Sequence, residues 1–158
     1  MRRQCMSSQS LQASSLLGAW TTTRWSRVRS HMTSFSSCTT SSLSYGFVKV
    51  YRELPMWTTG LWDAANEYIN VASVKTEFYN KWPRNNMYYN NFEISRLSLW
   101  LSGDYQRFIN YIDRLGGIYY HRWGDAPIKS IAVAMFVPRR RTHHFNDIGY
   151  HHQFFHHP

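Results

Sequence analysis

The sequence has only two cysteines, no acidic residue among its first 52 residues and no long apolar run. Cys5 and Cys38 both lie near the N-terminus, so neither a disulfide framework nor a cysteine-based zinc site is expected in the rest of the chain. No stretch of about 18 consecutive apolar residues occurs, and the sequence therefore predicts no transmembrane anchor. The charged start, residues 1–3, is followed by the serine-rich residues 7–15 instead of the apolar core of a signal peptide.

The missing acids make the N-terminal part strongly basic. Residues 1–46 contain five arginines and no acid, whereas the other 112 residues hold 13 basic and nine acidic side chains, from a total net charge of +9. The same part is rich in Ser and Thr and lacks a sustained apolar period. We therefore predict that residues 1–45 are a low-complexity segment, either disordered or an artefact of the gene model, and that residues 46–158 form one folded unit.

A basic chain in which 17% of residues are aromatic is also typical of nucleic-acid binders. Arginines neutralise phosphates, and aromatic rings stack on bases. No zinc-finger, homeodomain or RNP-type pattern is present, and a basic patch that serves an anionic nucleotide sugar has the same composition. A polyanion-binding or nucleic-acid-binding module without catalysis is therefore the alternative function.

The apolar pattern predicts alternating strands and helices, and hence an α/β architecture. We expect a strand at 47–51, a helix around 57–68, an aromatic-rich loop over 71–91, a helix at 96–115, a short strand at 118–121 and a helix at 126–137. Gly116 and Gly117 are expected to end the helix at 96–115, and Pro138 the last one.

The last predicted helix begins beside a possible catalytic carboxylate. Asp125 precedes Ala126 and Pro127, an order typical of a helix start because Asp accepts free backbone N–H groups and Pro fits the first turn. Arg139 to Arg141 follow its end, where the helix dipole favours positive charge. From the residues alone, helix capping explains Asp125 nearly as well as catalysis does.

Three motifs in this region carry a family resemblance. Asn-Phe-Glu-Ile at 91–94, Arg-Trp-Gly-Asp-Ala-Pro at 122–127 and Asp-Ile-Gly-Tyr-His-His at 147–152 resemble the fungal glycolipid 2-alpha-mannosyltransferase family, in matching order and spacing. The resemblance covers residues 46–158 and implies the C-terminal part of a GT-A-like α/β domain. It further implies mannose transfer from GDP-mannose, with Mn²⁺ and with retention, to N- or O-linked glycans at the lumenal side of the Golgi membrane.

The resemblance also assigns roles to single residues. Glu93 resembles the carboxylate beneath the reacting sugar carbon and is the candidate nucleophile, and Asp125 resembles a carboxylate that orients the acceptor hydroxyl. His152 resembles the manganese ligand. The predicted substrate-binding residues are Arg122, Trp123 and Tyr150.

Each role has a simpler alternative. A lone Glu93 is commonly a first-turn helix charge, and Arg122 is able to pair with a carboxylate instead of a phosphate. Six of the eight histidines lie between 143 and 157, so the C-terminal end is also interpretable as a metal-binding segment without catalysis.

The sequence departs from the family in ways that suggest a fragment. His121 replaces the family's Glu before Arg122, and the family's disulfides cannot form. The Glu-Pro-Asp motif of the nucleotide-binding half has no counterpart before residue 47. We therefore expect a partial mannosyltransferase whose partners are GDP-mannose and a mannosylated glycan or glycoprotein, with no nucleic acid, and with the family's membrane anchor absent from this chain.

Overall fold

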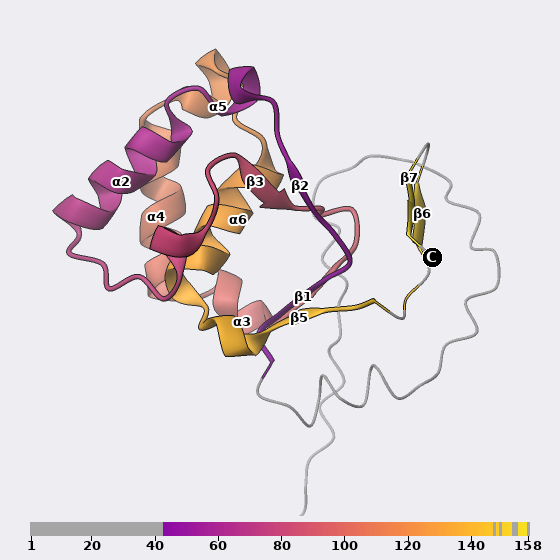
Figure 1. Cartoon of the computed structure of the whole chain (residues 1–158). Helices are drawn as coiled ribbons and strands as arrows, with labels where there is room; N and C mark the ends of the chain where they lie inside the picture. The colour runs from indigo at the N-terminus through magenta and orange to yellow at the C-terminus, as the bar shows by residue number, and fades with distance from the viewer. Residues whose placement is uncertain (1–42, 147, 149, 153–154, 158) are drawn as a thin grey trace, which may run out of the picture.

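The computed structural model describes residues 43–146, 148, 150–152 and 155–157 (Figure 1). The predicted low-complexity segment thus lies outside the described residues, except for 43–45. The described helices are α2 (Leu61–Val71), α3 (Leu97–Trp100), α4 (Gly103–Arg114), α5 (Gly117–Tyr120), α6 (Asp125–Phe136) and the 3-10 turns η1 (Pro55–Thr58), η2 (Tyr79–Lys81) and η3 (Arg139–Arg141). The strands are β1 (Tyr45–Phe47), β2 (Val50–Arg52), β3 (Asn86–Tyr88), β4 (Glu93–Ser95), β5 (Thr142–His144), β6 (Tyr150–His152) and β7 (Phe155–His157).

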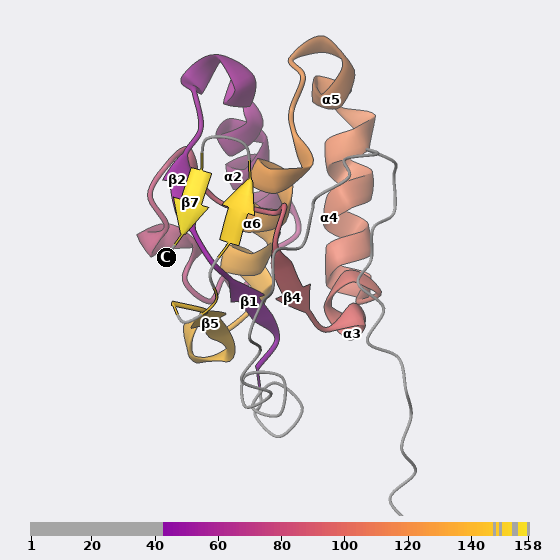
Figure 2. The same ribbon diagram turned by 90° about the vertical axis from the view of Figure 1, so that its right-hand side faces the viewer.

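Helix α6 forms the centre of the domain. Its sequence is apolar on nearly every side, and nine of its residues are buried. Ile128, Ile131 and Met135 belong to a core cluster with α2 and α4, whereas Val133 packs with residues of β1 and β3. Figure 1 and Figure 2 show α6 between these helices and these strands. Because it is covered on both sides, the helix needs no polar face.

The strands form small sheets around this helix, which confirms the expected α/β class. One sheet has the order β4-β1-β5, with β1 antiparallel to β4 and parallel to β5. A second sheet pairs β2 with β3 in antiparallel fashion. The register of β1 on β4 places Phe47 opposite Glu93, so the sheet itself fixes the position of the candidate nucleophile.

A buried serine ties α6 to β3. The Ser130 hydroxyl donates to the Ala126 carbonyl at 2.7 Å and accepts the Tyr88 backbone N–H at 2.8 Å. Ser130 is fully buried, so these bonds satisfy polar groups that have no access to water. The bond to Tyr88 sets how α6 lies on the strand.

Several predicted elements differ from the structure. The strand predicted at 47–51 is two strands, β1 and β2, which belong to different sheets. The helix predicted at 96–115 is α3 followed by α4, because the Ser102 hydroxyl accepts the Tyr105 N–H at 3.2 Å and caps a new helix. The strand predicted at 118–121 is wrong, since α5 occupies this segment. The predicted loop at 71–91 contains η2 and β3.

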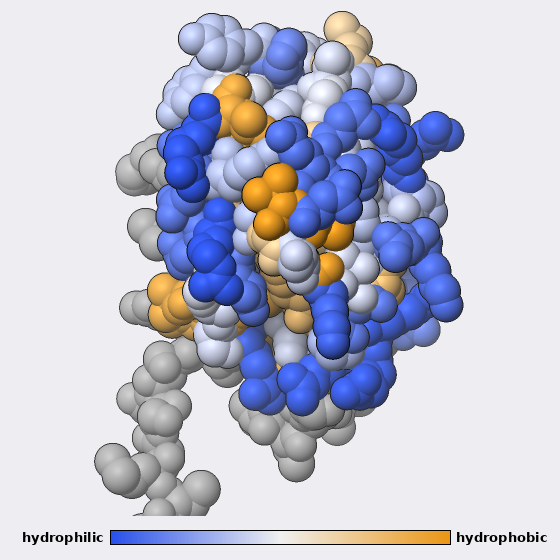
Figure 3. Space-filling view, turned by 90° about the vertical axis from the view of Figure 1, so that its left-hand side faces the viewer, coloured by the Kyte–Doolittle hydropathy of each residue, from blue (hydrophilic) through white to orange (hydrophobic). Residues whose placement is uncertain are grey.

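One face of the molecule is mainly polar. The face in Figure 3, which carries α2, is mostly hydrophilic with small separate apolar patches, as expected because Asp63, Asn66 and Glu67 point outward from that helix. In the part of the chain that the structure describes, every helix is too short or too polar to cross a bilayer.

Candidate active site

Glu93 lies in β4 with both carboxylate oxygens bonded. Tyr45, buried in β1, donates its hydroxyl to Oε2 at 2.9 Å, and Lys129 on α6 donates its Nζ to Oε1 at 2.8 Å. The side chains are 11% exposed for Glu93 and 26% for Lys129. Lys129 also lies over the Trp100 ring, 5.5 Å from its centroid. The carboxylate is thus held in one orientation beside a positive charge.

Asp125 stands one helical turn before Lys129 on α6, and both side chains line the same cavity. The cavity has a volume of about 170 Å³. Its lining residues are Tyr105, Ile109, Ile118, Trp123, Asp125, Ile128 and Lys129. Asn90 donates its side-chain amide to Asp125 Oδ2 at 2.6 Å. Lys129 therefore connects Glu93, its ion-pair partner, to the cavity that Asp125 borders.

The start of α6 corrects one sequence-based interpretation. The helix begins at Asp125, but Gly124 is the N-cap residue, and the Asp125 carboxylate accepts a hydrogen bond from the Asn90 side chain. Asp125 still lies in the first turn, where the helix dipole stabilises negative charge. Its carboxylate is exposed beside the cavity and is available to a polar ligand.

Tyr105 lines the same cavity from α4. Burial raises the pKa of its hydroxyl above 10, with further contributions from the negative charges of Glu93 and Asp125. The hydroxyl therefore stays protonated at neutral pH and is able to donate a hydrogen bond. Tyr105 lies in the helix predicted at 96–115 but was not predicted as a site residue.

Lys129 was also missed as a site residue, although one signal for it was present in the sequence. It follows Asp125 by four positions, which places the two side chains on the same face of a helix. Its contact with Glu93 had no such signal, because the two residues are 36 positions apart.

Arg122 and Trp123 are held by packing against η1 and its neighbours. The Arg122 guanidinium lies over the Trp57 ring at 4.9 Å, and its backbone adopts a positive φ of 56°. Trp123 is only 6% exposed and donates its indole N–H to the Thr59 carbonyl at 2.7 Å. Trp123 therefore has a clear structural role as well as a place in the cavity wall. Substrate binding by both residues stays a prediction.

Tyr150 and His152 lie in β6, which pairs with β7 so that Tyr150 is opposite His157. Figure 1 shows this hairpin beside the body that contains α6, not within it. Asp147 and Gly149 of the same motif lie outside the described residues. Among the side chains that the structure describes, no group of three His, Cys, Asp or Glu residues gathers as a metal site. Their roles in substrate and manganese binding stay predictions.

Known proteins resemble this chain in sequence. "Probable mannosyltransferase MNT3" from Candida albicans is 42% identical over 114 residues, which are 68% of this chain and 30% of that protein. "Glycolipid 2-alpha-mannosyltransferase" from Saccharomyces cerevisiae is 36% identical over 118 residues, with 68% of this chain and 27% of that protein covered. The chain thus spans less than a third of the length of these two relatives.

Solved structures resemble it in fold. The mannosyltransferase Ktr4p from S. cerevisiae, in complex with GDP, matches with a TM-score of 0.71 and 27% identity over 78% of this chain and 36% of that one. Core-mannan synthase A from Aspergillus fumigatus, in its Mn/GDP form, matches with a TM-score of 0.71, 26% identity and coverage of 78% and 38%. These matches confirm the expected partial glycosyltransferase fold.

The family profile gives the same result over most of the chain. Residues 34–158 match the profile described as glycolipid 2-alpha-mannosyltransferase. This span contains the carboxylates, the lysine and the cavity described above. The chain belongs to the glycolipid 2-alpha-mannosyltransferase family, and it matches a part of the length of the family members compared above.

Proposed function

We propose that this chain supplies the acceptor-side part of an α-1,2-mannosyltransferase. The reaction transfers mannose from GDP-mannose, with retention, to a mannose-containing N- or O-linked glycan at the lumenal side of the Golgi membrane. The main support is the arrangement in which Lys129 joins Glu93 to the cavity that Asp125 borders.

The proposed role of Glu93 follows from the demands of retention. Transfer with retention needs a group on one face of the sugar that stabilises or traps an oxocarbenium-like centre. The bonds from Tyr45 and Lys129 hold the carboxylate still, and each carboxylate oxygen has a second lone pair that these bonds do not use. A preorganised carboxylate of this kind loses little freedom when the sugar binds.

Asp125 and Tyr105 are proposed to bind the acceptor. Asp125 is an exposed carboxylate beside the cavity and accepts a hydrogen bond from the acceptor hydroxyl that attacks the donor sugar. Tyr105 donates a hydrogen bond from its hydroxyl to a neighbouring sugar oxygen. The apolar wall formed by Ile118 and Trp123 suits the less polar face of a sugar ring.

GDP-mannose and Mn²⁺ are proposed as donor and cofactor on the basis of the relatives, since one solved structure holds GDP and another Mn and GDP. When bound, Mn²⁺ neutralises negative charge on a diphosphate, and His152 is the residue proposed to hold it. Calorimetric titration of Mn²⁺ with and without GDP tests this, because shared contacts make each ligand raise the affinity of the other. Equal Mn²⁺ affinity in both titrations would contradict a joint site.

The transferase proposal is best tested in a chimera in which residues 43–158 replace the matching segment of S. cerevisiae Ktr4p. We expect the chimera to transfer mannose from GDP-mannose to an α-mannoside. Glu93→Gln should lower kcat on the order of 100-fold while leaving GDP affinity unchanged. Asp125→Asn should raise the KM for the acceptor more than the KM for the donor.

The matched control is Asp63→Asn on α2, where an exposed carboxylate pairs with Arg84. This variant should behave like the parent chimera. The proposed role of Glu93 would be refuted if the Glu93→Gln chimera kept near-normal turnover. It would also be refuted if the parent chimera formed a product in which the anomeric configuration of the transferred mannose is inverted.

A further inference from the structure

One end of the domain carries a surface that the proposed reaction does not use. Figure 1 shows α3 and the turn η3, directly before β5, at the same end of the molecule. We name this the basal surface. It consists of Arg96, Leu97, Leu101 and Arg139–Arg141, all of which are exposed, the two leucines by 55% and 67%.

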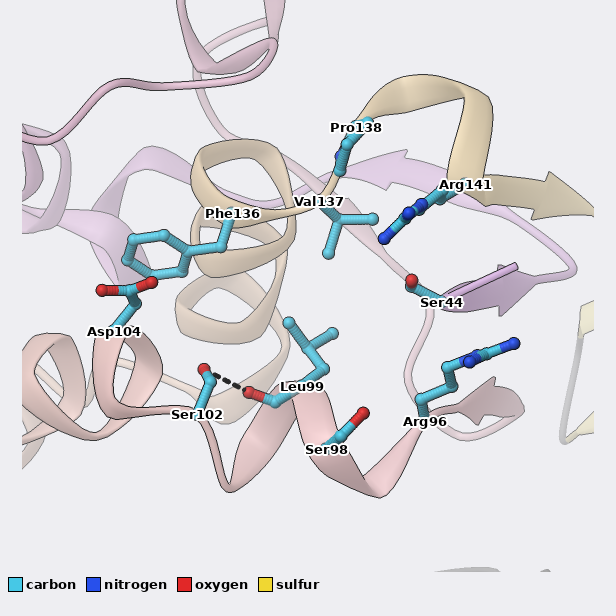
Figure 4. Close-up of a pocket in the computed structure, with 10 residues that line it drawn as sticks. All are labelled: Ser44, Arg96, Ser98, Leu99, Ser102, Asp104, Phe136, Val137, Pro138 and Arg141. Atoms are coloured by element: carbon cyan, nitrogen blue, oxygen red, sulfur yellow. Dashed lines mark hydrogen bonds between the residues drawn. The ribbon is translucent and has the colours of Figure 1, made fainter. Parts of the chain in front are cut away.

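A cavity opens between these residues. Its volume is about 190 Å³, and Arg96 and Arg141 border it together with the hydroxyls of Ser44, Ser98 and Ser102 (Figure 4). Leu99, Phe136, Val137 and Pro138 form its apolar part. Figure 4 shows Ser44 between the side chains of the two arginines. The Ser102 hydroxyl already donates to the Leu99 carbonyl at 2.7 Å, so the donors for the oxygens of a phosphate are the two arginines, Ser44 and Ser98.

Backbone bonds hold the two arginines on either side of Ser44. The Ser44 N–H donates to the Arg141 carbonyl at 2.8 Å, and the Arg96 N–H donates to the Ser44 carbonyl at 3.0 Å. Arg96 also donates its Nε to the Leu43 carbonyl at 2.5 Å. The fold therefore places both arginines beside the cavity, and the bond from Nε orients the Arg96 side chain.

The acidic residue that lines the cavity does not cancel this charge. Asp104 forms an ion pair with Arg107 at 2.5 Å, so its carboxylate already has a cation beside it. The other charged residues of the lining are Arg96 and Arg141, and Arg139 and Arg140 stand next to them in η3. The basal surface thus favours an anionic partner.

We propose that the basal surface binds a lipid bilayer that carries anionic, phosphate-bearing headgroups. The arginines and Ser44 bind headgroup phosphates, and Leu97 and Leu101 enter the interface between headgroups and acyl chains. The exposed leucines favour a bilayer over a small free anion, which would leave them in water. They also favour it over nucleic acid, since phosphate contacts alone would leave the leucines in water and stacking on single-stranded bases needs aromatic rings that the basal surface does not include. The proposal does not depend on transferase activity.

The test uses the full chain and sedimentation with vesicles of phosphatidylcholine alone or mixed with phosphatidylserine. We expect binding to the mixed vesicles and little binding to the neutral ones. Replacing Arg139, Arg140 and Arg141 by Gln should lower the partition coefficient on the order of 100-fold. The double variant Leu97→Ser, Leu101→Ser should lower it about tenfold. These side chains are exposed, so the variants should have the same thermal unfolding midpoint as the parent chain.

Two matched controls separate the basal surface from general effects. Replacing Arg24, Arg27 and Arg29 by Gln removes the same charge from the basic N-terminal segment, and Val71→Ser removes an apolar side chain that is 75% exposed on α2. Each control should retain clearly more binding than the basal variant with which it is matched.

Three results would overturn the proposal. The first is a basal variant that binds no more weakly than its matched control. The second is binding of inorganic phosphate that the arginine variant loses, together with unchanged vesicle binding in the leucine variant, which would indicate a site for a small anion. The third is tighter binding to a single-stranded oligonucleotide than to the mixed vesicles, lost in the arginine variant.

Discussion

The ion pair between Lys129 and Glu93 should contribute measurably to stability, although most surface ion pairs do not. Its nitrogen and oxygen are 2.8 Å apart, and the carboxylate side chain is only 11% exposed. Replacing Lys129 by Met keeps much of the aliphatic stem but removes the charge. Glu93 then remains largely buried, with the Tyr45 hydroxyl as its remaining donor.

The expected cost follows from this burial. Loss of a hydrogen bond to a charged group, with the partner left poorly solvated, predicts that Lys129→Met lowers the free energy of unfolding by about 2 to 3 kcal/mol. Glu93→Gln should cost about 1 kcal/mol, because Lys129 is 26% exposed and is able to turn toward water. In the double variant no charge remains unpaired, so its cost should fall at least about 1 kcal/mol below the sum of the two.

Urea unfolding, followed by tryptophan fluorescence and circular dichroism, measures these differences. The control is the Arg84–Asp63 pair, which has the same 2.8 Å separation but side chains that are 57% and 70% exposed. Arg84→Met should cost at most about 0.5 kcal/mol. If Lys129→Met costs no more than Arg84→Met, or if the two single costs simply add, the ion pair is not the stabilising contact inferred here.

Two further predictions concern packing and pH. A Cβ at Gly117 would lie 2.5 Å from the Trp123 ring, so Gly117→Ala should destabilise the fold by about 2 kcal/mol in thermal unfolding. Gly124→Ala meets no such clash, with 3.5 Å to its nearest atom, and should cost about 0.5 kcal/mol because alanine is a poorer N-cap than glycine. Burial raises the pKa of Tyr79 from 10.0 to about 12. The folded state therefore holds this proton more tightly, and the resulting stabilisation is complete below pH 10 and is lost as the pH rises toward 12. Urea unfolding at several pH values across this range should show that the free energy of unfolding depends less on pH in Tyr79→Phe than in the parent chain. An unchanged pH dependence would contradict the assignment.

The sequence by itself predicted the central helix and the family. Residues 126–137 are apolar except for Lys129 and Ser130, follow Asp125, carry a proline in the expected first turn and end before Pro138, so the local pattern predicts a core-facing helix there. The observed helix, Asp125–Phe136, agrees within a residue at each end. The motifs at 91–94 and 122–127 pointed to the family that the profile match confirms.

Local patterns failed where a short segment had two possible structures. Residues 118–121 have strand propensity, but Gly116, at a φ of 71°, turns the chain so that its carbonyl accepts the N–H groups of Tyr119 and Tyr120, and a helical turn results. The apolar period from 96 to 115 continues across Ser102, so it does not reveal that the serine hydroxyl starts a new helix. Hydrogen bonding decided both cases against propensity.

The site itself was only half determined by sequence. Motifs identified Glu93 and Asp125 as the carboxylates, but Lys129 and Tyr45 became part of the site only through contacts over 36 and 48 positions. The pairing of β1 with β4 brings Tyr45 to Glu93, and the packing of α6 against the strands brings Lys129 to its other oxygen. Local sequence preferences do not encode such long-range contacts, because these contacts depend on how separate helices and strands pack into one core.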